Sequence, residues 1–477
     1  MYFVTPDLAL GRRADAEDVL ALAANGIQAI LSLCPVLRPD GVICQLSMDV
    51  RDRVGLPAEA IQAAVGFLRA QIQAGRRVLV HCEMGLSRSP SIVVAYLHAV
   101  HGIPIEMAVD RIRETHPMAD PHPLLLASIR EQFCQTSGAV VNLSANENPL
   151  GPSAMAVEAI KGAISELHRY PDKDATVLRA KLATRLGVDQ AQILIGNGSC
   201  ELIDHLARAC LSPGDEALVP SPAFPVYLSA TRMAGGTVVP VPMPGGAYRV
   251  ESFLERVTQR TKLVMIGSPH NPTGTTLSEK EMKQLIDGLP EHVWLLVDEA
   301  YRDYVNAAEL ADALSWVAKG RNVIVMRSLS KAHGLAGLRI GYGVAPLRIA
   351  KAVDRLRQNY NTNTLAQMAA VAALDDDEHL ARTYTNNAFE LNRVQRRLKE
   401  MGVPFIPSRA NFVLVQASPD YVDRLAHAGV KVKEMARFGA PDHFRVSIGL
   451  PSENTRFLEA FAEVLEESRE ISQPVLA

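Results

Sequence analysis

The chain has 477 residues, of which 48% are hydrophobic and 21% charged, and its formal net charge is −3. The length is enough for two or three domains with several hydrophobic cores, and the composition is that of an ordinary globular protein. The charge argues against nucleic acid or an anionic membrane as the main partner. We find no apolar run long enough to span a bilayer and no signal-peptide pattern. The six cysteines form no CxxC pair, so we expect no metal site, no disulfide framework and a cytoplasmic location.

The first part of the chain combines short β-branched strands with amphipathic helices. The stretches 27–34 (IQAILSLC) and 77–82 (RVLVHC) are predicted to be buried parallel strands. Between them, residues 57–75 have helical spacing and stop at a glycine. Residues 89–102 (SPSIVVAYLHAVHG) are predicted to form a helix with Ser89 as its N-cap and a proline in its first turn. This order predicts an α/β domain over residues 1–135.

The loop between that second strand and helix has the composition of a phosphate site. It is the segment His81-Cys82-Glu83-Met84-Gly85-Leu86-Ser87-Arg88-Ser89. Backbone N–H groups at a helix N-terminus bind anions, and the same positive end favours the thiolate of Cys82, the predicted nucleophile. Gly85 permits backbone geometry that a side chain would obstruct, and Arg88 can hold two phosphate oxygens. The Ser89 hydroxyl is expected to help the sulfur leave in the second step.

This loop matches the pattern HCxxGxxRS, and residues 6–133 resemble the dual-specificity, tyrosine-phosphatase-like family. The resemblance implies a phosphate-monoester hydrolase that works through a cysteinyl phosphate. A general acid must protonate the leaving group. Asp49 is the predicted acid and Asp52 the alternative. His81 is expected to orient the loop, and His122 stands where the family usually has an asparagine.

Residues 136–141 are the predicted linker, and residues 142–470 the predicted second domain. Strand patterns such as TKLVMIGSP, VWLLVDEAY and NVIVMRSLS alternate there with helical ones. This alternation predicts a mostly parallel sheet with helices on both faces. The whole chain is therefore predicted to be α/β.

Four motifs of the second domain place polar residues where strands end and helices begin. They are GNGSCELID (196–204), GSPHNPTGT (267–275), LLVDEAYRDY (295–304) and SLSKAHGLAGLRIGYG (328–343). Together they meet the needs of pyridoxal 5'-phosphate. Lys331 is the predicted Schiff-base lysine, and Asp298 the carboxylate that keeps the ring nitrogen protonated. Asn271 and Tyr301 are expected at the ring hydroxyl, and Phe224 against the ring face.

The phosphate of this cofactor needs a helix N-terminus, hydroxyl groups and a cation. The residues predicted to supply them are Ser199, Cys200 (through its backbone), Ser328, Ser330 and Arg339.

Over about residues 140–470 the chain resembles the class I/II aminotransferases of fold type I, and among them the histidinol-phosphate aminotransferases. Further motifs that carry the resemblance are NLSANENPLGPS (142–153), HRYPD (168–172), SRANFVL (408–414) and FRVSIG (444–449). The resemblance implies a large α/β domain with a smaller one, and Lys331 as general acid and base. It implies glutamate and 2-oxoglutarate as the default amino donor and acceptor.

The same resemblance assigns residues to the substrate and to a second subunit. Arg445 is expected to anchor the acidic group of the substrate, with Asn148 and Asn411 nearby. Lys433 stands where these enzymes usually carry an arginine for the distal anion, and a lysine keeps the charge but loses the fork. Tyr170 is expected to reach the cofactor phosphate of a neighbouring subunit, which predicts a homodimer.

Two sites in one chain predict a bifunctional enzyme that transaminates a small phosphorylated compound and removes a phosphate, in consecutive steps. Histidinol phosphate is the first candidate. One alternative is a decarboxylase of a phosphorylated amino acid, resembling the threonine-phosphate enzymes, fused to a phosphatase; it would release carbon dioxide without an oxo-acid acceptor. Another is a regulatory protein phosphatase whose larger part only binds the cofactor.

Overall fold

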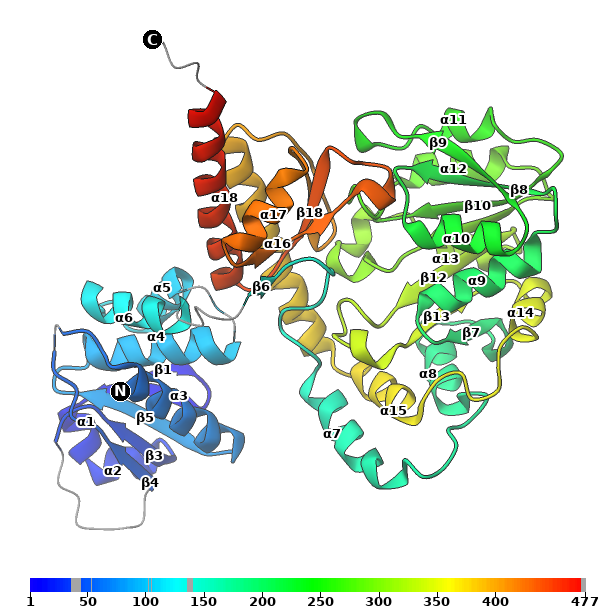
Figure 1. The fold of residues 1–477 in the computed structure, drawn as a ribbon. Helices are drawn as coiled ribbons and strands as arrows, with labels where there is room; N and C mark the ends of the chain where they lie inside the picture. The colour runs from blue at the N-terminus through cyan, green and yellow to red at the C-terminus, as the bar shows by residue number, and fades with distance from the viewer. Residues whose placement is uncertain (36–43, 53, 102, 104, 135–139, 473–477) are drawn as a thin grey trace, which may run out of the picture. The chain divides into compact units, whose positions relative to one another are not determined.

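The structure is a computed structural model of the chain. It describes all residues except 36–43, 53, 102, 104, 135–139 and 473–477. Two compact units, Met1–Ala139 and Val140–Ala477, are described here one at a time (Figure 1). Most of the predicted linker lies outside the described residues, and its last residue, Val141, already belongs to a strand of the second unit.

A five-stranded sheet in the order β1-β2-β5-β3-β4 forms the centre of the first unit. Its strands are β1 (Tyr2–Thr5), β2 (Leu8–Arg12), β3 (Ile27–Ser32), β4 (Cys44–Ser47) and β5 (Arg77–Cys82). All neighbours run parallel except β1 and β2. The two predicted strands are confirmed as β3 and β5, and continuous apolar runs such as Val78–Val80 are fully buried between helical layers.

The helices of the first unit are α1 (Arg13–Glu17), α2 (Val19–Ala24), α3 (Ala58–Gln73), α4 (Arg88–His101), α5 (Ile105–Thr115) and α6 (Pro123–Cys134). The prediction that Ser89 is the N-cap of α4 is wrong, because that helix begins at Arg88. Its first backbone bond runs from Ser91 N–H to the carbonyl of Ser87, at 3.0 Å. Ser89 thus lies in the first turn, directly behind the loop.

The second unit has a seven-stranded sheet in the order β7-β13-β12-β11-β10-β8-β9. The strands are β7 (Ile193–Gly196), β8 (Glu216–Ser221), β9 (Thr237–Pro242), β10 (Thr261–Gly267), β11 (Trp294–Asp298), β12 (Val323–Ser328) and β13 (Gly341–Val344). Six of the strands run in the same direction, and β13 runs opposite to them, between β12 and β7. Separate hydrophobic cores lie on the two faces of this sheet, which confirms the predicted arrangement.

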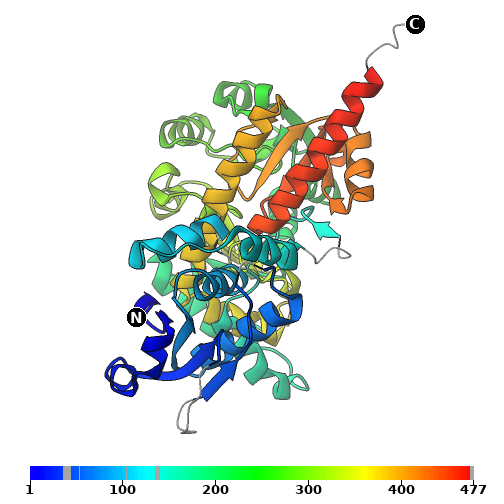
Figure 2. The same cartoon turned by 90° about the vertical axis from the view of Figure 1, so that its left-hand side faces the viewer.

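The chain ends of the second unit form a smaller subdomain. Its strands are β6 (Val141–Asn142), β14 (Phe405–Ile406), β15 (Phe412–Gln416), β16 (Val430–Lys431), β17 (Lys433–Glu434) and β18 (His443–Ser447). The longest helices of the unit, α16 (Asp377–Glu400) and α18 (Pro451–Ser472), contact each other beside these strands (Figure 2). A separate core of Phe444, Phe457, Phe461 and aliphatic neighbours holds the subdomain together.

The remaining helices of the second unit are α7 (Ala154–Ala163), α8 (Thr176–Leu186), α9 (Ser199–Cys210), α10 (Pro225–Met233), α11 (Val250–Leu254), α12 (Glu279–Gly288), α13 (Ala313–Ala318), α14 (Leu347–Asp354), α15 (Thr364–Ala373) and α17 (Asp420–His427). Over the described part of the chain, no helix is long and apolar enough to cross a membrane.

Candidate active sites

The phosphate-binding loop of the first unit is built around the sulfur of Cys82. The Ser89 hydroxyl lies 3.3 Å from that sulfur, and the Gly85 N–H donates to it, also at 3.3 Å. Cys82 ends β5 and Ser89 lies in the first turn of α4, so the strand-to-helix connection itself brings them together. The Gly85 N–H stabilises negative charge on the sulfur, and the Ser89 hydroxyl is placed to donate to it as well.

Gly85 is the residue that lets the loop close. Its φ is +74°, a conformation that residues with a side chain rarely adopt. A Cβ at this position would lie 3.0 Å from the carbonyl oxygen of Gly11, in the neighbouring strand β2. The sequence argument for glycine here is therefore confirmed on two grounds.

Arg88 links the loop to the segment that carries the predicted general acid. Its Nη1 donates to the carbonyls of Leu33 and Val50, at 3.2 and 2.9 Å. Asp49, adjacent to Val50, is exposed and lines a cavity of about 480 Å³. Asp52 is also exposed but does not line that cavity. The geometry thus ties the Asp49 segment to the loop arginine.

His81 lies behind the loop and is fully buried. Its Nε2 is 2.8 Å from the Ser32 hydroxyl and its Nδ1 3.9 Å from the sulfur of Cys34. Burial, with a smaller contribution from Glu83, raises the pKa of the Cys34 thiol. These contacts hold the imidazole inside the sheet, which agrees with the predicted orienting role. His122 contacts the loop through its backbone, since its N–H donates to the Ser87 hydroxyl at 3.3 Å.

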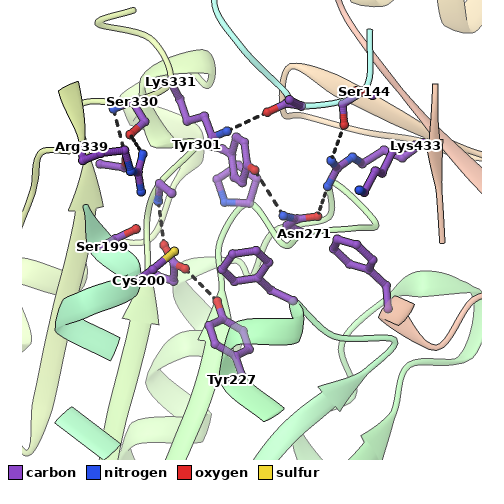
Figure 3. Close-up of a pocket in the computed structure, with 18 residues that line it drawn as sticks. Ser144, Ser199, Cys200, Tyr227, Asn271, Tyr301, Ser330, Lys331, Arg339 and Lys433 are labelled. Atoms are coloured by element: carbon purple, nitrogen blue, oxygen red, sulfur yellow. Dashed lines mark hydrogen bonds between the residues drawn. The ribbon is translucent and has the colours of Figure 1, made fainter. Parts of the chain in front are cut away.

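The second unit contains a cavity of about 320 Å³ at the ends of the central strands. Most residues predicted to bind the cofactor line it: Ser199, Cys200, Phe224, Asn271, Asp298, Tyr301, Ser328, Ser330, Lys331 and Arg339. Figure 3 shows Lys331 beside Tyr301, with Ser199, Ser330 and Arg339 gathered on one side and Lys433 on the other. Motifs spread over more than a hundred residues thus meet because parallel strands present their carboxyl ends at one edge.

A phosphate cradle lies at the N-terminus of α9. The Arg339 Nη1 lies 3.3 Å from the Ser330 hydroxyl. A Cβ on Gly198, whose φ is +81°, would lie 2.5 Å from Arg339 Nη2. The positive φ favours glycine here, and the absence of a side chain leaves room for this guanidinium against the helix N-terminus, where backbone amides and a cation together bind a phosphate. These residues fit the phosphate of pyridoxal 5'-phosphate.

Residues 145 and 146 contact the lysine and one of the residues predicted to bind the ring hydroxyl. Lys331 Nζ donates to the carbonyl of Ala145 at 2.9 Å. The Tyr301 hydroxyl accepts from the amides of Asn146 and Asn271, at 3.0 and 3.3 Å. Because its oxygen already accepts two hydrogen bonds, the Tyr301 O–H is free to donate to an oxygen anion in the cavity.

Asp298 is the buried carboxylate of the site. Burial raises its pKa to about 6, while the hydrogen bond from Tyr227 and the one from the Ala300 N–H oppose that rise. The Tyr227 hydroxyl donates to Oδ2 at 2.9 Å, and burial raises the pKa of Tyr227 well above its ordinary value. Tyr227 thus remains a donor, and it steadies the ionised form of Asp298 that pairs with a protonated ring nitrogen.

The raised pKa of Asp298 predicts a pH-dependent cofactor affinity. The carboxyl is neutral below about pH 6 and then cannot pair with a cationic ring nitrogen. Affinity is therefore expected to be flat above that pH and to fall below it by up to about tenfold per unit. The measurement is the dissociation constant of pyridoxal 5'-phosphate between pH 5 and 8, with Asp298→Asn as control. The prediction is contradicted if the parent and the Asp298→Asn variant show the same pH dependence of cofactor affinity.

Arg445 lines the cavity and is 4% exposed. Its Nη1 donates to Asn271 Oδ1 at 2.5 Å and its Nη2 to the carbonyl of Ser144 at 3.1 Å. Its Nε has no hydrogen-bond partner among the described residues. No carboxylate of those residues lies within ion-pair distance of the guanidinium. A buried cation without a counter-charge is costly, so this guanidinium is suited to bind an anionic ligand.

Two residues predicted to lie near the acidic group of the substrate contact other parts of the chain. Asn148 and Asn411 do not line the cavity. Asn148 donates to the carbonyl of Ala332 at 2.8 Å and to the Thr383 hydroxyl at 3.0 Å, so it braces the loop that follows Lys331 against α16. Asn411 donates to the carbonyl of Asn146 at 3.1 Å. The amide nitrogens of both residues thus contact neighbouring segments of the chain, whereas Asn411 Oδ1 has no hydrogen-bond partner among the described residues.

Sequence reasoning missed several residues of the site. Ser144 and Ala145 take part through their carbonyls, which leave no side-chain signal. Tyr227 follows Phe224 by three residues at the start of α10, and that helical spacing could have placed both on one side. Phe438 lies against Arg445, 5.4 Å from the guanidinium to the ring centre. Metal-binding clusters are absent from the described residues.

This arrangement of fold and site defines a pyridoxal-phosphate-dependent aminotransferase. The chain belongs to the class I and II aminotransferases, whose family model matches residues 139–461. The catalytic domain of the dual specificity phosphatases matches residues 8–134. The chain thus contains two enzyme domains.

Several named proteins and solved structures are similar to the chain. Histidinol-phosphate aminotransferase 2 of Pseudomonas fluorescens Pf-5 is 40% identical over 330 residues, which are 68% of this chain and 89% of that protein. The histidinol-phosphate aminotransferase of Methylobacillus flagellatus is 37% identical over 76% of this chain and 98% of its own length. The solved structure of the Sinorhizobium meliloti enzyme in complex with pyridoxal-5'-phosphate has a TM-score of 0.65 and 29% identity, and the match covers 71% of this chain and 95% of that one.

Proposed function

We propose that the chain transaminates a small phosphorylated compound and hydrolyses a phosphate monoester in a consecutive step. The observation that carries the first half is the pair of cations Arg445 and Lys433. They are directly opposed on the antiparallel strands β18 and β17, and both line the cavity. Opposed residues project from the same face of a sheet, so both charges can contact one doubly charged anion, such as a phosphate monoester or a dicarboxylate.

The residues around the cavity divide the work of transamination. Pyridoxal phosphate supplies an electron sink when it is bound. Lys331 would hold the cofactor covalently and serve as the proton-transferring amine, while Tyr301 and Asn271 would hold the ring oxygen. Phe224 would cover the ring. Arg445 anchors the acidic group of the amino donor, for which we propose glutamate.

In the first unit, the proposed reaction runs through Cys82. Its thiolate attacks phosphorus, an S–P bond forms, and the ester P–O bond breaks as Asp49 protonates the leaving oxygen. Water then attacks phosphorus, the S–P bond breaks, and inorganic phosphate leaves. The Ser89 hydroxyl and the Gly85 N–H, each 3.3 Å from the sulfur, stabilise the returning thiolate. Such a thiol persists best in a reducing compartment, so we place the reaction in the cytoplasm.

The first candidate substrate is histidinol phosphate, because similar proteins are named for it and because it carries the ester that the first unit would hydrolyse. The test supplies histidinol phosphate and 2-oxoglutarate to the full chain, and mass spectrometry follows glutamate, the oxo product and histidinol, alongside free phosphate. Glutamate formation with phosphate release supports the proposal. A phosphorylated amino acid, such as threonine phosphate, supplied alone tests the alternative, because its release of carbon dioxide without an oxo-acid acceptor would replace transamination by decarboxylation.

A substitution of Lys433 tests the paired-cation argument. Lys433→Gln removes one of the two charges, and we expect KM for histidinol phosphate to rise about tenfold with kcat little changed, since a binding contact is lost. Lys433→Arg is expected to retain a low KM. The matched control is Lys431→Gln, an exposed lysine on β16 that does not line the cavity. Equal KM changes for the two glutamine variants would contradict the argument.

We also propose a homodimer with shared sites. Tyr170 is 82% exposed and stacks on Tyr360, with ring centres 4.7 Å apart. It does not line the cavity of its own chain. A large exposed aromatic pair of this kind is typical of an interface. Sedimentation equilibrium of the parent and of Tyr170→Ser tests the dimer, and an unchanged monomer in both would contradict it.

A further inference from the structure

The His116 side chain lies behind the phosphate-binding loop and contacts it at one atom. Its Nε2 is 3.1 Å from the carbonyl oxygen of Gly85. The ring is 4% exposed and stacks on Tyr2, with centres 4.0 Å apart and planes 5° from parallel. Nδ1 has no hydrogen-bond partner among the described residues. Because a carbonyl can only accept, the contact to Gly85 requires the proton on Nε2.

The geometry of the peptide bond converts this contact into an effect on the loop. The Gly85 carbonyl shares its peptide unit with the N–H of Leu86. In a trans peptide these two groups point in opposite directions, and the Gly85–Leu86 bond is not among the cis bonds of the described residues. A donor that holds the carbonyl toward His116 therefore turns the Leu86 N–H away from His116.

The next peptide unit is held from the same side. The backbone N–H of Asp120 donates to the carbonyl of Leu86 at 2.7 Å, which likewise turns the Ser87 N–H away. Both carbonyls are thus engaged by the segment 116–120, and both amides point toward the opposite side of the loop. Consecutive inward amides are the arrangement that binds an anion.

Glycine makes such a holding contact necessary. Gly85 has a φ of +74°, and a residue without a side chain passes easily between backbone conformations. A rotation of the Gly85–Leu86 peptide would remove one amide from the anion and replace it with a carbonyl oxygen. The hydrogen bond from His116 opposes that rotation.

We propose that His116 is a positioning residue of the phosphatase site, whose Nε2–H holds the Gly85 carbonyl so that the Leu86 N–H contacts the phosphate oxygens. The inference rests on the proposed phosphatase function. It assigns no proton transfer to His116, which touches neither the phosphate nor Cys82. The stack on Tyr2 fixes the plane of the ring that makes the contact.

Two substitutions separate donation from packing. His116→Phe keeps an aromatic ring against Tyr2 but has no donor, whereas His116→Gln keeps a donor but has no ring. The probe is tungstate, a tetrahedral dianion, and its dissociation constant is measured by calorimetry on the full chain with Cys82→Ser. We expect His116→Phe to weaken tungstate binding about tenfold, and His116→Gln to bind it nearly as the parent does.

His98→Phe is the matched control, because His98 Nδ1 also lies near a backbone carbonyl, that of Ile103, at 3.0 Å. That carbonyl is not part of the loop, so tungstate binding is expected to be unchanged. The inference is overturned if His116→Phe binds tungstate as the parent does, or if His116→Gln loses as much affinity as His116→Phe. If the parent chain itself binds no tungstate, the proposed phosphatase function fails, and the inference fails with it.

Discussion

Replacement of Lys331 by alanine is expected to lower the aminotransferase rate by at least about 10⁴-fold, because both the attachment point of the cofactor and the proton-transferring amine are lost. Phosphate release by the first unit should keep its parent rate, since its residues come from a separate compact unit. The measurements are the rate of glutamate formation and the visible absorbance of the attached cofactor, which should disappear.

Lys351→Ala is the matched control for this substitution. Lys351 is an exposed lysine in the last turn of α14 and does not line the cavity. Its loss should leave both the absorbance and the rate unchanged. If the Lys331→Ala chain still transaminates at about a tenth of the parent rate, only the energy of about one modest contact has been lost. Such a result would show that Lys331 does not take part in the chemistry.

Replacement of Cys82 by serine is expected to lower phosphate release by at least about 10³-fold, because an alcohol is a far weaker nucleophile than a thiolate at neutral pH. The anion cradle remains, so substrate binding should persist while turnover stops. The measurement is free phosphate from histidinol phosphate and from p-nitrophenyl phosphate. Trapping the phosphoryl group on Cys82 with acid quench and mass spectrometry tests the cysteinyl phosphate directly.

Cys44→Ser is the control here. Cys44 is an exposed, free thiol in the same unit, on β4, and is not part of the phosphate-binding loop. Its substitution should leave phosphate release intact. If Cys82→Ser and Cys44→Ser lose the same small fraction of activity, the hydrolysis does not proceed through Cys82.

The two variants together determine the order of the proposed steps. If the Lys331→Ala chain consumes histidinol phosphate only by hydrolysis, and the Cys82→Ser chain only by transamination, both sites accept the same compound. If instead one variant accumulates a phosphorylated product that the other removes, the reactions are consecutive. Two sites in one chain raise the local concentration of an intermediate. This advantage exists only if the product of one site is the substrate of the other.

The sequence alone was enough to predict the strand–loop–helix segment around Cys82 and the alternating strands of the second unit. Both depend on short-range patterns: a β-branched run, a glycine, and a helix start within about a dozen residues. The cofactor residues could be predicted for the same reason. Asp298 ends a strand, Lys331 and Asn271 each come shortly after one, and parallel strands bring their carboxyl ends to one edge of the sheet.

What the tertiary structure alone decided is which of several suitable polar groups face each site. Asn146, and not Asn148, contacts the Tyr301 hydroxyl, because the backbone of the segment turns through a positive φ of 54° at Asn146. Contacts such as Tyr227 to Asp298 or His116 to Gly85 join residues 71 and 31 positions apart. Residue type and spacing encode local conformation, whereas the direction of a buried hydrogen bond depends on how separate elements pack, and no local pattern specifies that.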